Sequence, residues 1–241
     1  MAFGPTPASR VFNPALLGTP IAVWEAGLEH ARALTVPHGA VVVVSPHPDD
    51  EVLGAGGLIH AAALVGRKVA LLSVTDGEAA YPDCPGLAEV RCREVREALR
   101  ALGASDVAIQ RLQIPDGRVD HRRATLASAL ERCISPGTLL VAPYECDGHP
   151  DHDATGEVCC EIATRHGLTL WRYPIWTWHH SAPGAFAVNS WGRLFLDAAA
   201  LRAKTEAVRC FTSQVRPPGR EPIVPSHVLP YFLRPYEAYL T

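Results

Sequence analysis

The segment VVVVSPHPDDEVLGAGG, residues 41–57, constrains the fold more than any other part of the chain. Val41–Val44 is a continuous apolar run, which is typical of a parallel strand with both faces covered by helices. A histidine, three acidic residues and a glycine-rich stretch follow it directly. Ligands of open parallel sheets bind beyond the carboxyl ends of the strands. We therefore expect these polar residues to lie at a binding site.

Strand and helix patterns alternate from residue 39 onward. The predicted strands are Val41–Val44, Lys68–Thr75, Val107–Leu112, Thr138–Ala142 and Leu168–Tyr173. The predicted helices are Leu53–Val65, Leu87–Leu102, Arg122–Cys133, Ala154–His166 and Asp197–Phe211, with Asp197 as an N-cap. This alternation indicates βαβ units. It predicts an α/β fold with a mostly parallel sheet and the active site at the carboxyl ends of its strands.

The 241 residues are predicted to form a single domain, 1–241. Residues 1–38 carry five prolines around a helix predicted at Ala22–Leu34, and we expect them to form a leader packed on the outside of the domain. Residues 215–241 are again rich in proline. A disordered tail is one interpretation of this segment. Its interleaved aliphatic and aromatic residues favour an ordered strap against the body of the domain.

Composition narrows the classes of function. The formal net charge is -3 and no basic run is present, so nucleic acid is not an expected partner. No apolar run approaches the roughly 20 residues that a membrane-spanning helix needs. The N-terminal sequence has no signal-peptide pattern, and the seven cysteines form no C-x-x-C pair. We therefore expect a cytoplasmic protein with reduced thiols.

His47 and Asp50 lie three positions apart at the predicted opening of a helix. That spacing can bring an imidazole and a carboxylate onto one cation, and it leaves Asp49 free to act as a base. The following Gly54, Gly56 and Gly57 would let the backbone approach a ligand closely.

Two other interpretations of this segment stay open at this point. The acidic residues could cap the helix, where its dipole favours negative charge. The glycines could also belong to a dinucleotide-binding turn. That interpretation is disfavoured because Ile59 stands where the pattern needs glycine or alanine, and because the acids would repel a pyrophosphate.

A second motif, APYECDGHPDHDATGEV at residues 142–158, repeats the same order of strand, polar loop and helix. Parallel strands end at one edge of a sheet, so we expect His152 to lie near His47 and Asp50. Two histidines and one carboxylate around an open position are typical of a catalytic zinc site, which polarises a carbonyl and activates a water. The alternative for His149 and His152 is a solvated loop.

Together, SPHPDDEVLGAGG and DGHPDH resemble the PIG-L family of N-acetylglucosaminyl deacetylases, also called LmbE-like. The stretches SVTDGE, RCRE, IPDG and AKTEAVRCFTSQ resemble further family segments. The resemblance implies a Rossmann-like three-layer fold. It also implies a zinc-dependent hydrolase that removes the N-acetyl group from an N-acetylglucosamine-type conjugate, releasing acetate and a free amine. Fe²⁺ is an alternative metal in the cell.

The resemblance also implies roles for particular residues. The family's metal ligands correspond to His47, Asp50 and His152. Its general base corresponds to Asp49. Its second histidine, which assists the leaving group or the oxyanion, corresponds to His149.

Further positions correspond to supporting residues. Asp151 is expected to orient an imidazole, and Arg91 and Asp116 to contact the sugar. Asp147 stands where the mycothiol branch of the family has a tyrosine. This departure weakens a mycothiol-type assignment, and we expect Asp147 to hold His149 in its catalytic tautomer.

The aromatic segment WRYPIWTWHH, residues 171–180, follows the last predicted strand. Trp176, Trp178, His179 and His180 are expected to contribute a substrate-binding rim over the site, since aromatic faces suit sugar rings. The alternative is that these side chains close the core under the strap. A role for His179 and His180 as extra metal ligands is less favoured.

A small-molecule amino sugar conjugate is the expected partner, and the sequence leaves open whether the protein forms homo-oligomers. Two alternatives to a deacetylase remain. One is a metal-dependent amidase that acts on a larger acyl group or a non-sugar amide. The other is a non-catalytic sugar-binding domain of the same fold, which the complete set of motif residues disfavours.

Overall fold

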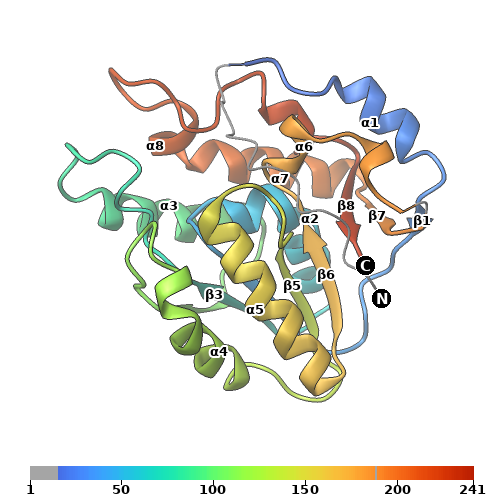
Figure 1. Cartoon of the computed structure of the whole chain (residues 1–241). Coiled ribbons are helices and arrows are strands. Elements are labelled where there is room, and N and C mark those ends of the chain that lie inside the picture. Colours follow the sequence, from blue (N-terminus) through green and yellow to red (C-terminus); the bar gives the residue numbers. More distant parts are fainter. Residues whose placement is uncertain (1–15, 188) are drawn as a thin grey trace.

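A computed structural model describes residues 16–187 and 189–241 (Figure 1). Its centre is an eight-stranded sheet of order β1-β7-β8-β6-β5-β2-β3-β4. The strands are β1 (Arg32–Ala33), β2 (Val41–Ser45), β3 (Val69–Ser73), β4 (Ala108–Arg111), β5 (Leu139–Pro143), β6 (Thr169–Tyr173), β7 (Trp191–Phe195) and β8 (Tyr236–Leu240). Only β8 runs antiparallel to its neighbours in this described sheet. The predicted α/β fold with a mostly parallel sheet is confirmed.

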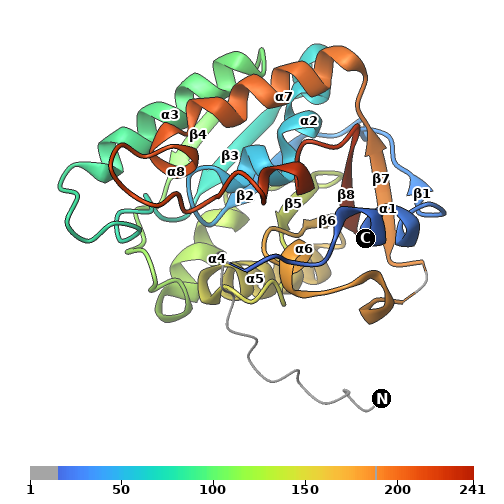
Figure 2. The ribbon, with the colours of Figure 1, turned by 90° about the horizontal axis from the view of Figure 1, so that it is seen from above.

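Helices cover both faces of the sheet and give three layers (Figure 2). On one face α2 and α3 pack against α7, and on the other α4 packs against α5. The α-helices are α1 (Ile21–Gly27), α2 (Asp50–Leu64), α3 (Leu87–Ala101), α4 (Arg123–Glu131), α5 (Pro150–His166), α6 (Thr177–His180), α7 (Ala198–Cys210) and α8 (Thr212–Val215). Short 3-10 helices occupy Asp120–Arg122, Pro183–Ala185 and Leu229–Tyr231. Within the described ranges, no helix has both the length and the apolar character of a membrane span.

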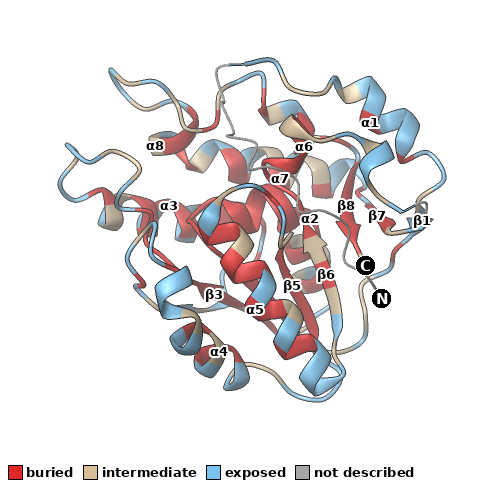
Figure 3. Cartoon of the chain, in the orientation of Figure 1, coloured by how far each residue is buried: buried red, intermediate tan, exposed pale blue. Residues whose placement is uncertain are grey.

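The four valines of β2 explain why its sequence does not alternate. Val41 and Val43 belong to the core beneath α2, α3 and α7, whereas Val42 and Val44 belong to the core beneath α4 and α5. A central strand with both faces covered therefore needs apolar residues at every position. Figure 3 shows the buried residues gathered along the central strands and on the helix faces turned toward them.

The strands and helices predicted beyond residue 39 are all present, with their ends shifted by a few residues. Asp197 caps α7 as predicted, by accepting a hydrogen bond from the N–H of Ala200 at 2.8 Å. The expected helix at Ala22–Leu34 is wrong beyond Gly27. Residues 32–33 instead pair with β7, and the Leu34 N–H donates to the Arg193 carbonyl, so sheet pairing replaces the last helical turns.

Both ends of the described chain enter the core. Trp24 and Leu28 are fully buried, so this part of the expected leader is not confined to the outside. The first part of that leader, residues 1–15, lies outside the described residues. In the strap, Val228 and Phe232 are buried in the same core, and β8 inserts between β6 and β7. Residues 215–241 are therefore an ordered strap and not a tail.

Helix α2 is broken near its first turn. Ala55 has φ -141° and ψ 17°, which lies outside the helical range. Beyond the break, the N–H groups of Gly57 and Leu58 donate to the Glu237 carboxylate at 2.6 and 2.9 Å. Before it, the Leu53 carbonyl accepts from Lys204 Nζ at 2.8 Å. Lys204 also donates to Glu237 at 2.6 Å, so one buried ion pair binds backbone groups on both sides of the break.

The glycines of α2 pack against protein side chains, so the expectation that they approach a ligand is wrong. A Cβ on Gly54 would lie 2.3 Å from the Tyr173 ring, and one on Gly57 would lie 2.4 Å from Leu196. A Cβ on Gly56 would lie 3.3 Å from the Lys204 chain. These glycines therefore let the broken helix sit directly on β6, α7 and β8.

We predict that Gly54→Ala destabilises the protein by about 1–3 kcal/mol, because the added methyl must displace the Tyr173 ring. Urea denaturation measures the effect. Gly184→Ala is the matched control, since its Cβ would meet no atom within 4 Å, and we expect a change within about 0.5 kcal/mol. Equal stability of the two variants would contradict this account of the packing.

Candidate active site

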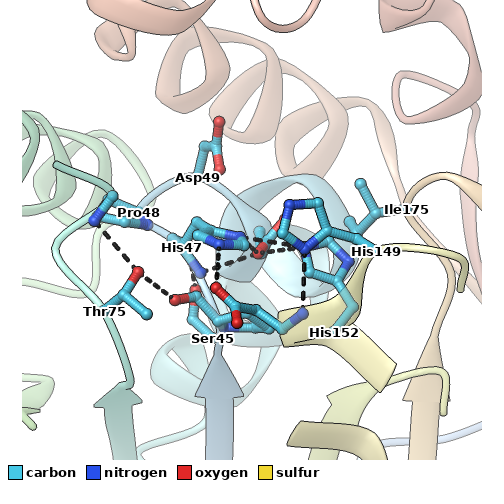
Figure 4. Close-up of polar contacts among 12 residues, drawn as sticks. Ser45, His47, Pro48, Asp49, Thr75, His149, His152 and Ile175 are labelled. Atoms are coloured by element: carbon cyan, nitrogen blue, oxygen red, sulfur yellow. Dashed lines mark hydrogen bonds and ion pairs between the residues drawn. The ribbon is translucent and has the colours of Figure 1, made fainter. Parts of the chain in front are cut away.

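The two histidine loops meet at one edge of the sheet. β2 and β5 are parallel neighbours, so the loops that follow them emerge side by side. The His47 ring lies 4.8 Å from the His149 ring and 5.2 Å from the His152 ring, measured between centroids. Figure 4 shows the three rings gathered together above the end of β2. The proximity of His152 to His47, expected from the sequence, is therefore present in the fold.

Three donor atoms form a compact triangle at the centre of this cluster. His47 Nδ1 lies 3.3 Å from Asp50 Oδ2, and His152 Nε2 lies 3.2 Å from the same oxygen. The two nitrogens are 3.1 Å apart. A tetrahedral zinc ion with bonds of about 2.0–2.1 Å separates its ligand atoms by about 3.3 Å. The donor set therefore fits one face of such a coordination sphere.

His149 stands beside this triangle. Ring nitrogens of His47, His149 and His152 lie within 4.8 Å of one another, so a cation could also reach His149. His149 is the N-cap of α5, and its Nδ1 accepts the N–H of Asp151 at 3.2 Å. Burial lowers the pKa of His149 to about 3, and the nearby His152 and His47 reinforce the effect. The ring is therefore neutral, with its proton on Nε2.

The buried Asp147 carboxylate orients His152. Its Oδ2 accepts from His152 Nδ1 at 2.8 Å, and its Oδ1 accepts from the N–H groups of Ile175 and Thr177 at 2.9 and 3.0 Å. Burial opposes ionisation, but His152 and these donors hold the pKa of Asp147 below its usual value. The arrangement leaves His152 Nε2 directed at the donor triangle, as in carboxylate–histidine–metal sites.

The expectation that Asp147 orients His149 is wrong. α5 begins at Pro150, earlier than predicted, so His149 occupies the cap and turns its Nδ1 to the Asp151 N–H. His152 lies inside the first turn and faces Asp147 instead.

Asp151 and Asp116 flank the opposite nitrogen of His47. His47 Nε2 lies 3.3 Å from Asp151 Oδ2 and 3.2 Å from Asp116 Oδ1. The backbone N–H groups of Gly117 and Val119 fix the Asp151 carboxylate at 2.7 and 3.1 Å. Ionised carboxylates only accept hydrogen bonds, so His47 Nε2 carries a proton and Nδ1 is free for a cation. These three side chains could also form a cation cluster of their own, but their geometry is that of an oriented imidazole.

Asp49 has a strained backbone and an unusual carboxyl group. Its φ is 130°, a value that residues with a side chain rarely adopt and that concentrates at functional sites. Burial raises the pKa of Asp49 to about 8, while Arg91 Nη2, at 3.5 Å from Oδ1, opposes that rise. A bound cation would also favour the ionised form. In Figure 4 the Asp49 side chain points away from the three rings.

The capping interpretation of the acidic segment is wrong for both residues that follow Pro48. Asp49 occupies the N-cap position, but its side chain makes no capping hydrogen bond. Asp50 Oδ2 accepts from the N–H of His47 at 3.0 Å, outside the helix. Both carboxylates are therefore available for the site instead of the helix end.

The predicted substrate contacts divide into two groups. Arg91 and Asp116 line the cavity above the donor triangle. The Arg91 guanidinium donates to the carbonyls of Pro48 and Gly77 at 2.6 and 3.0 Å, so it also ties the Asp49 loop to the loop after β3.

Trp178 and His179 lie away from this cavity. Trp178 is 3% exposed and stacks on Trp191, with their centroids 5.5 Å apart. His179 Nε2 contacts the Leu16 carbonyl at 2.6 Å, and His180 Nε2 contacts the Asp147 carbonyl at 2.7 Å. The surroundings of Trp178 and His179 match the core alternative, and neither histidine joins the donor triangle.

The cavity has a volume of about 260 Å³ and two chemically distinct sides. Its polar side holds the histidines and acids described above together with Arg91. Its apolar side comprises Leu53, Ala79, Ala80, Ile175, Trp176, Ile223 and Val224. Ile223 and Val224 come from the strap, and no sequence signal identified these two positions because only the folded strap brings them to the site.

Residues 42–163, about half of the chain, match the family described as PIG-L, GlcNAc-PI de-N-acetylase. The chain belongs to the PIG-L family. The match contains both histidine motifs, so the sequence resemblance is confirmed.

Two curated relatives and one solved structure illustrate the relationship. A probable N-acetyl-alpha-D-glucosaminyl L-malate deacetylase 2 of Bacillus cereus is 26% identical over 52% of this chain and 61% of its own length. A diacetylchitobiose deacetylase of Thermococcus kodakarensis is 31% identical over 53% of this chain and 50% of its own length. The crystal structure of the conserved protein TT1542 from Thermus thermophilus is 30% identical, with a TM-score of 0.54 over 72% of this chain and 79% of that one. The chain spans only about half the length of the curated relatives it matches.

We predict that Asp147→Asn weakens zinc binding about 10–100-fold, a typical cost of losing a group that orients a ligand. The amide NH₂ would face either the His152 Nδ1–H or backbone N–H donors, all of which need an acceptor. Competition with a chromophoric chelator measures the affinity. Asp106→Asn, an exposed change ahead of β4, is the control and should bind zinc like wild type. Unchanged affinity in Asp147→Asn would show that His152 does not need this partner.

Proposed function

We propose that the protein is a metal-dependent deacetylase that removes the N-acetyl group from an N-acetylglucosamine-type conjugate. The main support for this proposal is the triangle of donor atoms from His47, Asp50 and His152, which lie 3.1–3.3 Å apart beside a buried Asp49. Membership of the PIG-L family and the names of the deacetylase relatives support the same chemistry.

Zn²⁺ is the metal we propose, held by His47, Asp50 and His152. Two imidazole nitrogens and one carboxylate oxygen are typical ligands of catalytic zinc, and Fe²⁺ is the alternative in the cell. When bound, the ion would polarise the amide carbonyl and make a nearby water more acidic.

Asp49 is the proposed general base. It lines the cavity, and its side chain is not used to cap α2. Arg91 partly offsets the rise of the Asp49 pKa to about 8, and a bound cation would favour the carboxylate further. In the reaction, Asp49 takes a proton from the attacking water as the water oxygen bonds to the carbonyl carbon. The C–N bond then breaks as the protonated Asp49 returns that proton to the amine nitrogen, and acetate retains the new oxygen.

His149 is proposed to stabilise the negative charge that develops on the carbonyl oxygen. Its Nε2–H is a donor because Nδ1 already accepts the Asp151 N–H. A pKa near 3 disfavours an imidazolium that hands a full proton to the amine. The neutral ring therefore acts better as a hydrogen-bond donor than as an acid.

A small amino sugar conjugate is the proposed substrate. The cavity pairs a polar side with an apolar side that includes Trp176, which suits a sugar ring with its apolar faces and polar edges. A cytoplasmic location stays our proposal. The seven free cysteines support it, since thiols persist in reducing compartments.

Acetate release from a panel of N-acetylglucosamine conjugates tests the proposal with zinc-loaded protein. We expect Asp49→Asn to lower the rate about 10²–10⁴-fold, because it removes a general base, while zinc remains bound. Asp106→Asn should keep full activity. If zinc-loaded wild type releases acetate from no conjugate, the deacetylase assignment is wrong. If Asp49→Asn stays active, another group is the base.

Metal removal gives an independent test. Zinc at 100 times its Kd should stabilise the chelator-treated protein by about 2.7 kcal/mol, because an ion that binds only the folded state shifts the unfolding equilibrium. Thermal melting with and without zinc measures this shift. His152→Ala should lose it, since that change removes a donor of the triangle. An equal shift in this variant would place the ion elsewhere.

A further inference from the structure

Lys204 lies outside the cavity and outside the family match, yet its amine reaches the turn that carries Asp50. The residue sits on α7 and is 1% exposed. Its Nζ donates to the Leu53 carbonyl at 2.8 Å and to Glu237 at 2.6 Å. Leu53 itself lines the cavity, so the first of these bonds ends at the site.

The hydrogen bonds around the break show what Lys204 replaces. In an unbroken helix the Leu53 carbonyl would accept from the N–H of Gly57, four residues later. Here the Gly57 N–H donates to Glu237, and the break at Ala55 separates the two groups. Lys204 supplies the Leu53 carbonyl with a donor from α7 at the position where the helix is broken.

The first turn of α2 receives contacts at both of its ends. One end adjoins Asp49, whose φ of 130° is strained, and whose N–H donates to Glu51 at 3.2 Å. The other end is the Leu53 carbonyl, which accepts a hydrogen bond from Lys204. The turn keeps its own backbone hydrogen bond from the Leu53 N–H to the Asp49 carbonyl at 2.9 Å, and Lys204 adds a contact from α7 directly before the break.

We propose that Lys204 is a positioning residue of the metal centre: through the Leu53 carbonyl it fixes the turn that holds Asp50 in the donor triangle. Glu237 supports this role by pairing with the amine and by capping the helix beyond the break. The inference rests on the proposed metal-dependent function.

A buried ion pair can also serve stability alone, so the variants must separate the two roles. Lys204→Met would leave the Glu237 carboxylate buried without its partner, and this variant can fail to fold. The double variant Lys204→Met/Glu237→Gln avoids the unpaired charge. Its glutamine oxygen can still accept the N–H of Gly57, and its NH₂ then faces the N–H of Leu58, a cost that Glu237→Gln alone shares. Only in the double variant does the Leu53 carbonyl also lose Lys204.

Two reference variants complete the set. Glu237→Gln alone keeps the Lys204 contact with Leu53, because even a neutral amine donates. Leu130→Ala truncates a fully buried side chain in the core on the opposite face of the sheet, so it lowers stability without touching α2. Circular dichroism and thermal melting establish that each protein is folded.

Zinc affinity, measured by chelator competition, is the deciding readout. We expect the double variant to bind zinc about tenfold more weakly than wild type. Loss of a residue that orients a metal ligand typically lowers metal affinity by about 10–100-fold. Glu237→Gln should stay within about threefold, and Leu130→Ala should be unchanged. Acetate release should show a lower kcat with KM little altered, because the substrate does not touch Lys204.

The outcomes are distinguishable. A folded double variant that binds zinc like wild type overturns the positioning role, and so does an equal loss in Leu130→Ala, which would reflect stability alone. If the double variant loses zinc affinity while wild type releases no acetate, the positioning role holds and only the deacetylase function fails. Wild-type protein that binds no zinc overturns both proposals.

Discussion

The parallel pairing of β2 with β5 is the constraint on which the candidate site depends. It brings the loops after the two strands to one edge of the sheet, where His47 and Asp50 meet His152, although 105 residues separate the two histidines in sequence. Neither loop could form the donor triangle alone. The apolar cores on both sides of β2 hold this pairing in register, so the site inherits its geometry from burial at the centre of the fold.

Each imidazole of the triangle has a buried acid on its far side, which fixes its direction. Asp147 holds His152, while Asp151 and Asp116 hold His47. These acids are themselves fixed by backbone N–H groups from several loops, so the sheet edge acts as a rigid frame. Such support is what a metal site needs, because ligands that move must be reordered whenever an ion binds.

The sequence predicted the fold and the proximity of His47, Asp50 and His152 because each motif follows a recognisable strand and parallel strands end at one edge of a sheet; the role of these residues as metal ligands stays a prediction. An apolar run followed by His47 and Asp50 indicates a central strand and a site at its end. The break at Ala55 escaped prediction because the side chains that bind its flanks, Lys204 and Glu237, are distant in sequence. The strands β7 and β8 escaped because they pair with each other across a long stretch of chain. Trp178 shows a further limit: an aromatic side chain suits a sugar rim and a core equally, and only the fold decides between them.

The place of β8 in the sheet affects the order in which the protein can assemble during synthesis. β8 lies between β6 and β7, which precede it in the chain and so cannot pair with each other. About sixty residues separate Tyr173, at the end of β6, from Tyr236, at the start of β8. A ribosome that adds about 5–20 residues per second needs roughly 3–13 s to synthesise them. Through that interval the edge of β6 exposes unpaired backbone groups, which can template aggregation. Glu237 arrives with β8, so the turn that carries Asp50 gains its full support only when the sheet closes.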